Sequence, residues 1–334
     1  MRKSKPVFSL HVVIIILSMP LFVFSLRTGP RHSDPCNRPP VDPRTLQPDQ
    51  LTVLINGYSE HRIPLLQSIA ATYAAASSVA AVVILWGNPT TPPQILSNLS
   101  ESLSLSAATS STPISILRQR SSSLNLRFYP HRSITTRAVL ICDDDIEPDP
   151  KSVTFAFNVW KSNPDRLIGL FVRSHNYDLS QKSWIYTMEN NKYSIVLTKF
   201  MILNLRYLYE YSCNKEYTQL RAKVEEKNNC EDILMNFLVA EEMKKGPILV
   251  GAKRVRDWGD ARNEGGEMKE REVGLSSRKG EHRKRRGECI TEFHGLLGKM
   301  PLRYSYGKVM DSIGEQGLCE KGGKLVYCDR QIFR

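Results

Sequence analysis

Short apolar runs alternate with a helical pattern from residue 51 onward. Leu51–Ile55 is an apolar run that ends in Asn56 and a glycine, and Val79–Trp86 is a second run that ends at Gly87. Between them, residues 63–73 repeat apolar side chains at the three-to-four-residue spacing of one helix face. Strand, helix and strand with apolar cores predict an α/β domain whose parallel sheet is covered by helices on both faces.

The same alternation leads to an acidic cluster. Residues 90–115 are predicted to form a helix flanked by loops, and apolar runs at 114–117 and 124–128 follow. The strand predicted at 138–142 continues directly into Asp143, Asp144 and Asp145. Adjacent carboxylates repel one another unless a cation neutralises them, and ligands of open α/β sheets bind at the carboxyl ends of strands. The cluster is therefore a candidate site for a divalent cation and diphosphate oxygens; the alternative is an acidic turn or helix N-cap.

The N-terminus carries a segment long enough to cross a membrane. Three basic residues within Met1–Lys5 precede Pro6–Leu26, which contains no Asp, Glu, Lys or Arg. About 20 residues of helix span the ~30 Å core of a bilayer. Residues 27–31 offer no small-residue cleavage site, so we expect an uncleaved signal anchor rather than a signal peptide. The basic end should stay cytoplasmic, which predicts a single-pass type II membrane protein.

This organisation divides the chain into four parts and places most of it in the secretory lumen. The parts are a cytoplasmic tail at 1–6, the transmembrane anchor at 7–26, a Pro-rich stem at 27–49 and a lumenal domain at 50–334. In the lumen, Asn98 of the Asn-Leu-Ser sequon is a predicted glycosylation site. Disulfides are also permitted there, although seven cysteines are too few for a small disulfide scaffold.

The chain is basic, because 46 Lys and Arg exceed 34 Asp and Glu by 12. Such an excess indicates a polyanionic partner or an anionic membrane surface. Residues 253–286 are densely charged and end in the basic run 283–286. This run would suggest nucleic-acid binding in a soluble chain, but the anchor argues against a nucleic-acid partner. Two interpretations stay open: a solvated loop, and a basic surface that meets an anionic acceptor.

Eight ordered blocks between Leu51 and Tyr306 resemble glycosyltransferase family 64, the catalytic domain of the exostosin-like proteins. The blocks are TVLINGY (52–58), LWGN (85–88), SLNLRF (123–128), AVLICDDD (138–145), FAFNVWKSNPDRLIG (155–169), KYSIVL (192–197), NCEDILMNF (229–237) and MPLRYS (300–305). Two further segments, VRDWGDARNE (255–264) and HRKRRG (282–287), resemble the plant-type members that mannosylate glycosyl inositol phosphorylceramides.

The resemblance implies a GT-A nucleotide-sugar transferase fold and a retaining transfer that depends on Mn²⁺. It also implies roles at matching positions: Asp145 as the Mn²⁺ ligand, Asp143 and Asp144 near the ribose and donor sugar, Asn56 and Asn88 at the nucleobase, Asn125 and Arg127 facing the donor and diphosphate, Asp232 as the catalytic residue, and Arg303 at the diphosphate. Read from the residues alone, Asp232 also suits the N-terminus of a helix, and Arg303 suits a surface salt bridge.

For the cysteines, the resemblance implies a Cys230–Cys289 disulfide. Cys142, at the end of an apolar strand, is predicted to be a buried thiol, and no cysteine spacing matches a zinc site. A second bridge between Cys319 and Cys328 is plausible. The pairing of Cys36, Cys142 and Cys213 is left open by the sequence.

Two departures from the family leave the donor undecided. The exostosin-like enzymes carry an arginine shortly after the tyrosine of the first block, where this chain has Ser-Glu-His and then Arg62, and Glu231 stands where the family often has Asp. The plant branch implies GDP-mannose and an anionic glycolipid acceptor, a glycosyl inositol phosphorylceramide, in the Golgi membrane. The alternatives are an exostosin-like transferase that uses a UDP-N-acetylhexosamine on a glycan chain, and a non-catalytic lumenal binding subunit; assembly with other Golgi transferases is compatible with each.

Overall fold

The computed structural model describes residues 34–37, 39–107, 111–259, 279–311 and 317–328. The chain divides into two compact units, residues 1–34 and 35–334, and the second contains the folded domain. The predicted tail and anchor lie outside the described residues. Within the described ranges, no helix combines the length and the apolar character that crossing a membrane requires.

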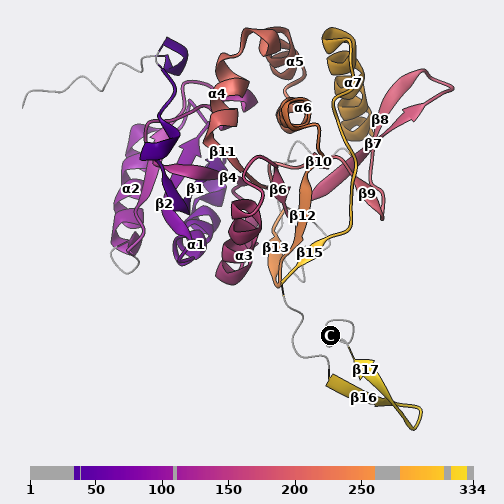
Figure 1. Ribbon diagram of the computed structural model, residues 1–334. Helices are drawn as coiled ribbons and strands as arrows, with labels where there is room; N and C mark the ends of the chain where they lie inside the picture. The colour runs from indigo at the N-terminus through magenta and orange to yellow at the C-terminus, as the bar shows by residue number, and fades with distance from the viewer. Residues whose placement is uncertain (1–33, 38, 108–110, 260–278, 312–316, 329–334) are drawn as a thin grey trace, which may run out of the picture. The chain divides into compact units, whose positions relative to one another are not determined.

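An eight-stranded sheet forms the centre of the domain (Figure 1). Its strands, in spatial order, are β15 (Val309–Met310), β12 (Ile248–Gly251), β6 (Ile168–Gly169), β11 (Phe200–Asn204), β4 (Thr136–Asp143), β1 (Gln47–Gly57), β2 (Val79–Trp86) and β3 (Ile114–Arg118). Among these eight, β11 runs antiparallel to both of its neighbours, and every other pairing is parallel. The predicted α/β class is confirmed, and β11 makes the sheet mixed.

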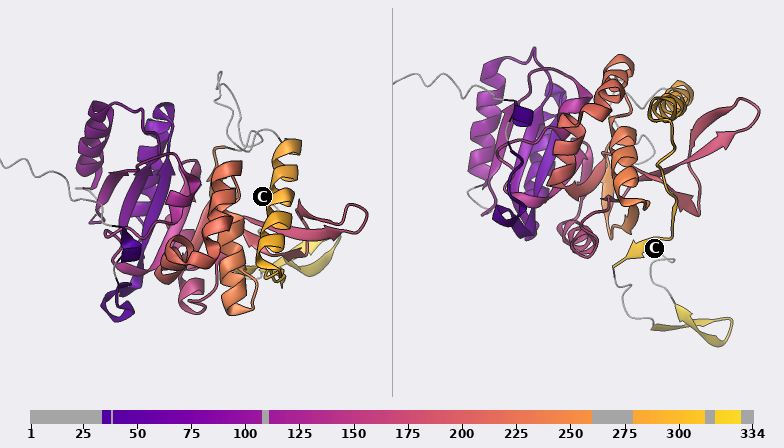
Figure 2. Two further views of the ribbon diagram at one scale, coloured as in Figure 1. Left: turned by 90° about the horizontal axis from the view of Figure 1, so that it is seen from above. Right: turned by 45° about the horizontal axis from the view of Figure 1, so that its top comes forward.

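Helices cover both faces of this sheet (Figures 1 and 2). One face carries α1 (Ile63–Ala74), α2 (Pro93–Ala107) and α3 (Pro150–Lys161). The other face carries α4 (Leu205–Cys213) and α6 (Glu231–Met243), beside which α5 (Thr218–Lys227) and α7 (Lys279–Leu297) pack.

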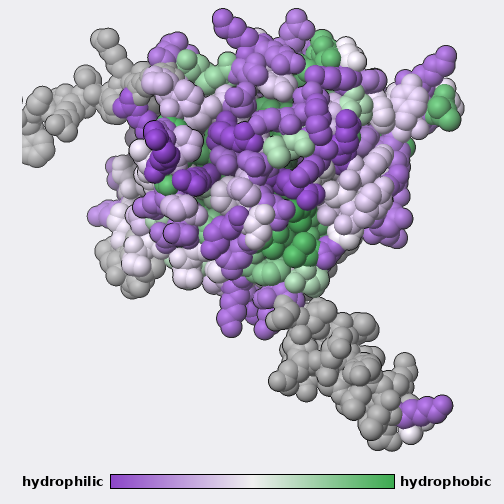
Figure 3. All heavy atoms as spheres, in the orientation of Figure 1, coloured by the Kyte–Doolittle hydropathy of each residue, from purple (hydrophilic) through white to green (hydrophobic). Residues whose placement is uncertain are grey.

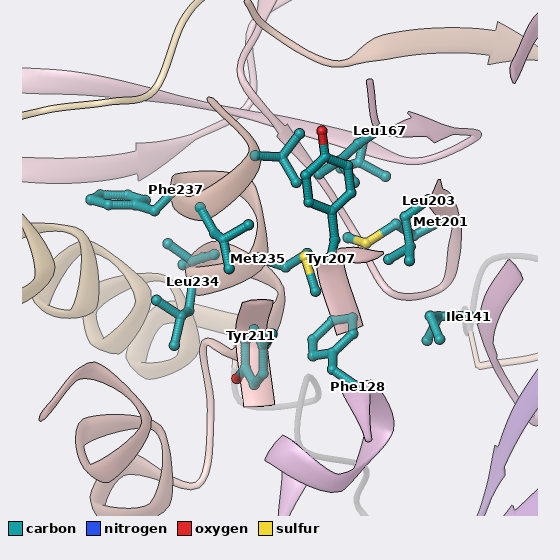
Figure 4. Close-up of a cluster of buried hydrophobic side chains, with 14 of the residues drawn as sticks. Phe128, Ile141, Leu167, Met201, Leu203, Tyr207, Tyr211, Leu234, Met235 and Phe237 are labelled. Atoms are coloured by element: carbon teal, nitrogen blue, oxygen red, sulfur yellow. The ribbon is translucent and has the colours of Figure 1, made fainter. Parts of the chain in front are cut away.

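Neighbouring strand residues serve opposite cores because side chains alternate along a strand. Leu54 of β1 packs in the core beneath α4 and α6, whereas Ile55 packs beneath α1 and α3. Figure 4 shows the first of these cores, where Phe128 and Tyr211 lie close together with ring centroids 4.7 Å apart. Buried apolar side chains on both faces explain why these strands read as continuous apolar runs.

Shorter elements complete the domain. A three-stranded sheet consists of β10 (Ile195–Val196), β7 (Val172–Asp178) and β8 (Ser183–Thr187), and three two-stranded sheets pair β5 (Ile146–Pro148) with β13 (Val255–Asp257), β9 (Lys192–Tyr193) with β14 (Ser305–Tyr306), and β16 (Gly317–Lys321) with β17 (Lys324–Cys328). The 3₁₀ helices are η1 (Pro35–Asn37), η2 (Pro43–Thr45), η3 (Glu60–Arg62), η4 (Leu124–Phe128) and η5 (Lys215–Tyr217). The apolar run at 124–128 thus forms the helix η4 and not a strand, since the Ser123 hydroxyl caps it by accepting the Asn125 N–H.

Exposed apolar side chains gather at two places on the face seen in Figure 3. One is the sheet edge around β15 and β13, where Val255, Val309 and Met310 are 36–41% exposed. The other is the tip of the β7–β8 hairpin, where Leu179 is 83% exposed. The rest of this face is mostly polar, in keeping with the charged composition.

Two disulfides tie distant parts of the domain together. Cys230 bonds to Cys289, as the resemblance implied, and joins the start of α6 to α7. Cys36 bonds to Cys213 at the end of α4, so residues placed in the stem by the sequence are attached to the domain. Cys142 is a buried free thiol, as predicted. The side chains of Cys319 and Cys328 lie outside the described part of the chain.

Replacing both Cys230 and Cys289 by alanine is expected to lower the free energy of unfolding by about 4 kcal/mol. The bond links residues 59 apart, and opening this loop restores conformational entropy to the unfolded chain. Urea unfolding of the full chain measures the change. Cys142→Ala is the matched control, since it removes a buried sulfur that closes no loop. An equal loss in the control would mean that packing, and not the cross-link, accounts for the effect.

Candidate active site

The three aspartates lie where the parallel strands of the sheet end. Asp143 is the last residue of β4, and Asp144 and Asp145 form the turn into β5. Asn56 lies opposite Asp143 in the register of β1 and β4, and its side-chain amide donates to the Cys142 carbonyl (3.1 Å). Because the two strands are parallel, their carboxyl ends meet at one edge, which is where open α/β sheets bind ligands.

Two arginines contact the three carboxylates in the described structure. Arg127 Nη1 lies 2.7 Å from Asp143 Oδ1. Arg62 Nη1 lies 2.9 Å from Asp144 Oδ1 and 3.3 Å from Asp145 Oδ2. Arg62, four residues after the end of the first block, therefore contacts the acidic motif.

Asp145 is the carboxylate best suited to a hard divalent cation. Burial, followed by the charges of Asp143 and Asp144, raises the pKa of Asp145 to about 7. Its Oδ1 atom is buried and has no hydrogen-bond partner among the described residues. A carboxylate oxygen is a ligand that Mn²⁺ accepts, so the residue fits this ion. The described residues contain no group of three or more acidic, histidine or cysteine side chains placed to hold a metal ion.

Residues 257–259, which follow β12 in the chain, pack against Asp145. The Trp258 N–H donates to the Asp145 carbonyl (2.8 Å), and the Trp258 indole donates to Glu147 Oε2 (2.9 Å). Lys199 Nζ lies 2.5 Å from Asp257 Oδ2 and its charge favours the ionised form of Asp145. At Gly259, an added Cβ would overlap Asp145 Oδ2, so the backbone can approach the carboxylate only because this residue has no side chain.

Gly259→Ala is expected to weaken Mn²⁺-dependent nucleotide binding about tenfold, because the new methyl group must displace the Asp145 carboxylate. Calorimetric titration with nucleotide and Mn²⁺ measures the change. Gly295→Ala on α7 is the matched control: an added Cβ there meets no atom within 4 Å, and affinity should stay at the wild-type value. Unchanged affinity in Gly259→Ala would show that the position of Asp145 does not govern binding.

A second group of buried charges lies at the start of α6. Glu231 and Asp232 occupy its first turn, where the helix dipole favours negative charge. Arg286 on α7 donates to Asp232 Oδ2 (2.6 Å) and to Asn229 Oδ1 (3.1 Å), and both side chains of the ion pair are 4–6% exposed. Its guanidinium also packs over the ring of Tyr186, 4.5 Å from the centroid. Asp232 is thus both a helix N-terminal acid and one partner of a buried ion pair.

Arg127 joins the two acidic groups into one site. The Nη1 atom that contacts Asp143 also lies 3.0 Å from Thr198 Oγ1 and 3.6 Å from Glu231 Oε1. Burial raises the pKa of Glu231 to about 7, although the charge of Arg127 opposes this effect. A single guanidinium therefore connects the end of β4 to the first turn of α6, and places the Asp143 motif next to Asp232.

Comparison of the sequence with known proteins assigns the chain to a family. The sequence profile of the Glycosyl transferase family 64 domain matches residues 51–314. The chain belongs to glycosyltransferase family 64. It is 57% identical over 325 residues to "Glycosyltransferase family protein 64 C3" of Arabidopsis thaliana, covering 97% of this chain and 98% of that protein. The family 64 chain is accordingly a glycosyltransferase.

More distant relatives cover less of the molecule. Exostosin-1a of Danio rerio is 36% identical over 203 residues, and Exostosin-1 of Bos taurus is 36% identical over 201 residues. Each match covers 58% of this chain and only about a quarter of the exostosin, at 26% and 25% of its length. A solved structure of GalNAc-T7 with UDP, GalNAc and Mn²⁺ covers 57% of this chain and 40% of its own, with 8% identity and a TM-score of 0.42, which is too low to support an argument.

The remaining residues predicted from the family lie in different settings. Asn125 is occupied by structural contacts: its side chain accepts the Tyr211 hydroxyl (2.5 Å) and donates to Glu225 (2.7 Å). Asn88 follows β2 at the same sheet edge and accepts the Thr90 N–H (2.9 Å). Arg303 is exposed and donates to the carbonyls of its own segment, those of Met300 and Leu302, so the described structure does not bring it to the aspartates.

Asn98, the predicted glycosylation site, lies exposed on α2, where its side chain accepts a hydrogen bond from Gln94 (2.8 Å). This position leaves the amide accessible from solvent. Its glycosylation stays a prediction.

Arg286 is the partner of Asp232 that sequence reasoning did not place in the candidate site. It stands in the basic run 283–286, which we interpreted as a solvated loop or an acceptor surface. The run belongs to helix α7 and not to a loop, so Arg283 and Lys284 face solvent while Arg286 turns inward. The acceptor surface stays a prediction. The available signal was its position three residues before Cys289, which places both on one side of a helix. Residues 260–278 of the charged segment lie outside the described structure.

Proposed function

We propose that this enzyme transfers a sugar from a nucleotide-sugar donor with retention of configuration and with the help of Mn²⁺, in a GT-A type of active site. The observation that carries the proposal is the position of Arg127, which contacts both Asp143 and Glu231 and so joins a diphosphate-type acidic motif to the buried Asp232. Sugar transfer needs both the acidic motif and Asp232, because the donor must be held by its diphosphate while its anomeric carbon reacts at the other end.

Positive charge is available where the donor diphosphate would lie. Departure of a nucleoside diphosphate leaves negative charge, which cations stabilise most strongly in a site sheltered from water. Arg127 and Arg62 are held at the acidic motif by the ion pairs described above. Asp145, with Asp143 and Asp144 beside it, would hold Mn²⁺, which supplies further neutralisation of the leaving diphosphate when bound.

Asp232 is held in a defined orientation. Its Oδ2 atom accepts from Arg286, and its Oδ1 atom accepts the Ile233 N–H (2.8 Å). A carboxylate fixed in this way needs no reorganisation to stabilise positive charge that develops at an anomeric carbon, as carboxylates do in glycoside chemistry. We therefore assign Asp232 to the reacting end of the donor, with Arg286 as the residue that positions it.

For the substrates, we propose GDP-mannose as the donor and a glycosyl inositol phosphorylceramide head group as the acceptor. The extended identity to a plant family 64 protein supports this choice, as does the plant-type segment at 255–264. The exostosin relatives support the alternative, a UDP-N-acetylhexosamine donor with a glycan acceptor. We also propose that the segment 7–26 anchors the protein in the Golgi membrane with the domain in the lumen.

Nucleotide binding by the full chain tests the proposal. The purified protein is titrated by calorimetry with GDP and with UDP, each with and without Mn²⁺. Binding of GDP that requires Mn²⁺ is the expected result, and a preference for UDP would favour the exostosin-like alternative. Folded protein that binds neither nucleotide would contradict a transferase role and favour a non-catalytic binding subunit.

A further inference from the structure

We propose that Arg62 competes with Mn²⁺ for the acidic motif and exchanges its partners when the ion binds. Its guanidinium holds Asp144 and Asp145 together until Mn²⁺ takes these carboxylates, and the released guanidinium then pairs with the donor diphosphate. This exchange rests on the proposed function and adds to it how the binding of the ion and the binding of the nucleotide are coupled.

A single nitrogen of Arg62 bridges two neighbouring carboxylates. Its Nη1 atom lies 2.9 Å from Asp144 Oδ1 and 3.3 Å from Asp145 Oδ2. Divalent ions of diphosphate sites are held in a similar way, by one or two carboxylates together with substrate phosphates. An ion on the same oxygens would lie within a few ångströms of the guanidinium, and like charges at that distance repel strongly. The ion and the guanidinium therefore exclude one another.

The carboxylates are confined, so the guanidinium is the partner that moves. An added Cβ at Gly259 would lie 2.4 Å from Asp145 Oδ2, and the Trp258 N–H donates to the Asp145 carbonyl, so this aspartate is enclosed on the side of residues 258–259. The side chains of Asp144 and Asp145 are only 10% and 15% exposed, whereas that of Arg62 is 35% exposed. Arg62 can move into solvent without disturbing the core.

The other arginine of the motif is held more firmly. Arg127 is 17% exposed, and its Nη1 atom contacts Thr198 and Glu231 as well as Asp143. The hydrogen bonds of the Arg62 guanidinium to described residues are those with Asp144 and Asp145. Two carboxylates thus hold Arg62, and both are oxygens that the ion would take, whereas Arg127 keeps contacts outside the motif.

The charges of the motif favour such an exchange. When ionised, the three aspartates carry one negative charge more than Arg62 and Arg127 together neutralise. Binding of Mn²⁺ reverses this balance and leaves an excess of one positive charge. A diphosphate offsets that excess, and guanidinium groups pair well with phosphate oxygens. Because coupling is reciprocal, the nucleotide should strengthen the binding of Mn²⁺ by the same factor by which Mn²⁺ strengthens the binding of the nucleotide.

The reactivity of Arg62 tests the exchange directly in the full wild-type chain in detergent. Phenylglyoxal modifies accessible guanidinium groups, and mass spectrometry of the peptides measures the rate at each arginine. With Mn²⁺ alone, the rate at Arg62 should rise at least about threefold, because the ion shifts the side chain toward solvent. Further addition of GDP or UDP should lower the rate again.

Arg206 is the matched control for this measurement. Its guanidinium is 41% exposed and also contacts two carboxylates, those of Asp165 and Glu242, outside the motif. Its rate of modification should not respond to Mn²⁺ or to nucleotide. An equal response at Arg206 and Arg62 would mean that the ion changes the whole domain, and would overturn the inference.

Binding of Mn²⁺ alone gives a second test, read from the electron paramagnetic resonance signal of the free ion. Arg62→Gln removes the competing charge and should bind Mn²⁺ about tenfold more tightly than wild type. The same variant should gain less affinity for Mn²⁺ when nucleotide is added. Arg206→Gln should equal wild type in both measurements. The first test uses only wild-type protein, so it decides the question even if Arg62→Gln folds poorly.

The outcomes separate this exchange from the proposed function. Mn²⁺-dependent nucleotide binding with an unchanged rate at Arg62 would overturn the exchange and leave the transferase proposal standing. A rate at Arg62 that rises with Mn²⁺ in a protein that binds neither nucleotide would refute the proposed function and retain the competition between Arg62 and the ion. Binding of Mn²⁺ to folded Arg62→Gln that equals or falls below that of wild type would contradict the competition itself.

Discussion

Asp232→Asn is expected to reduce turnover on the order of 1,000-fold and to leave nucleotide affinity within about twofold of wild type. The substitution keeps the shape of the side chain but removes the negative charge that we assign to the reacting end of the donor. In the proposed function the donor diphosphate is assigned to Arg127, Arg62 and the aspartates at the end of β4, which the change does not touch. Steady-state turnover with saturating donor, together with nucleotide calorimetry, measures the two effects separately.

The same substitution also costs stability, and a second variant separates the two roles. Arg286 is buried, and neutralising its partner leaves an unpaired charge, which costs about 3–5 kcal/mol. The double variant Asp232→Asn, Arg286→Gln replaces the ion pair by two neutral amides and should regain much of that stability in urea unfolding. Turnover should stay low in the double variant. Recovery of turnover together with stability would mean that Asp232 is structural and not catalytic.

Asp145→Ala is expected to abolish the effect of Mn²⁺ on nucleotide binding. The affinity for the nucleotide measured with Mn²⁺ should fall about 100-fold or more, to the affinity measured without Mn²⁺. The buried, unpartnered Oδ1 atom of Asp145 is the oxygen best placed to bind the ion. Asp143 and Asp144 remain in the variant, but neither has a buried oxygen that lacks a hydrogen-bond partner among the described residues.

Its control is Asp165→Ala, which removes a carboxylate that is 46% exposed and paired with Arg206 outside the motif. Calorimetry with and without Mn²⁺ should find this variant equal to wild type. A persistent Mn²⁺ effect in Asp145→Ala would assign the ion to another carboxylate, and the role of Asp145 would then be limited to the packing of Trp258 and Gly259.

Much of the fold follows from local patterns along the chain. The strands 79–86 and 138–142 and the helix 63–73 were predictable because both faces of the sheet are buried, which makes each strand a continuous apolar run. The antiparallel strand β11 and the helix η4 were not recognised. A short apolar run does not show in which direction a strand runs, nor whether the run forms a strand or a 3₁₀ helix.

The acidic half of the site was equally visible in the sequence. Asp143–Asp145 follow a strand directly, so local chemistry indicated this group, whereas Asp232 was assigned to the site by the family resemblance. The family resemblance added the Cys230–Cys289 bond, which the structure confirms. Arg303 donates to the carbonyls of its own backbone segment, and its role at the diphosphate stays a prediction.

What connects these parts was decided by the tertiary structure. Arg127 reaches Glu231 across more than 100 residues of sequence. Arg286 reaches Asp232 from a basic run in which Arg283 and Lys284 are exposed, and Cys36 bonds to Cys213 at the end of α4. Sequence patterns record which residues are apolar, acidic or helical, because these preferences act over a few neighbouring residues. The partner of a charge or a thiol depends on which helix packs beside which strand, and that choice is made only when the whole core is assembled.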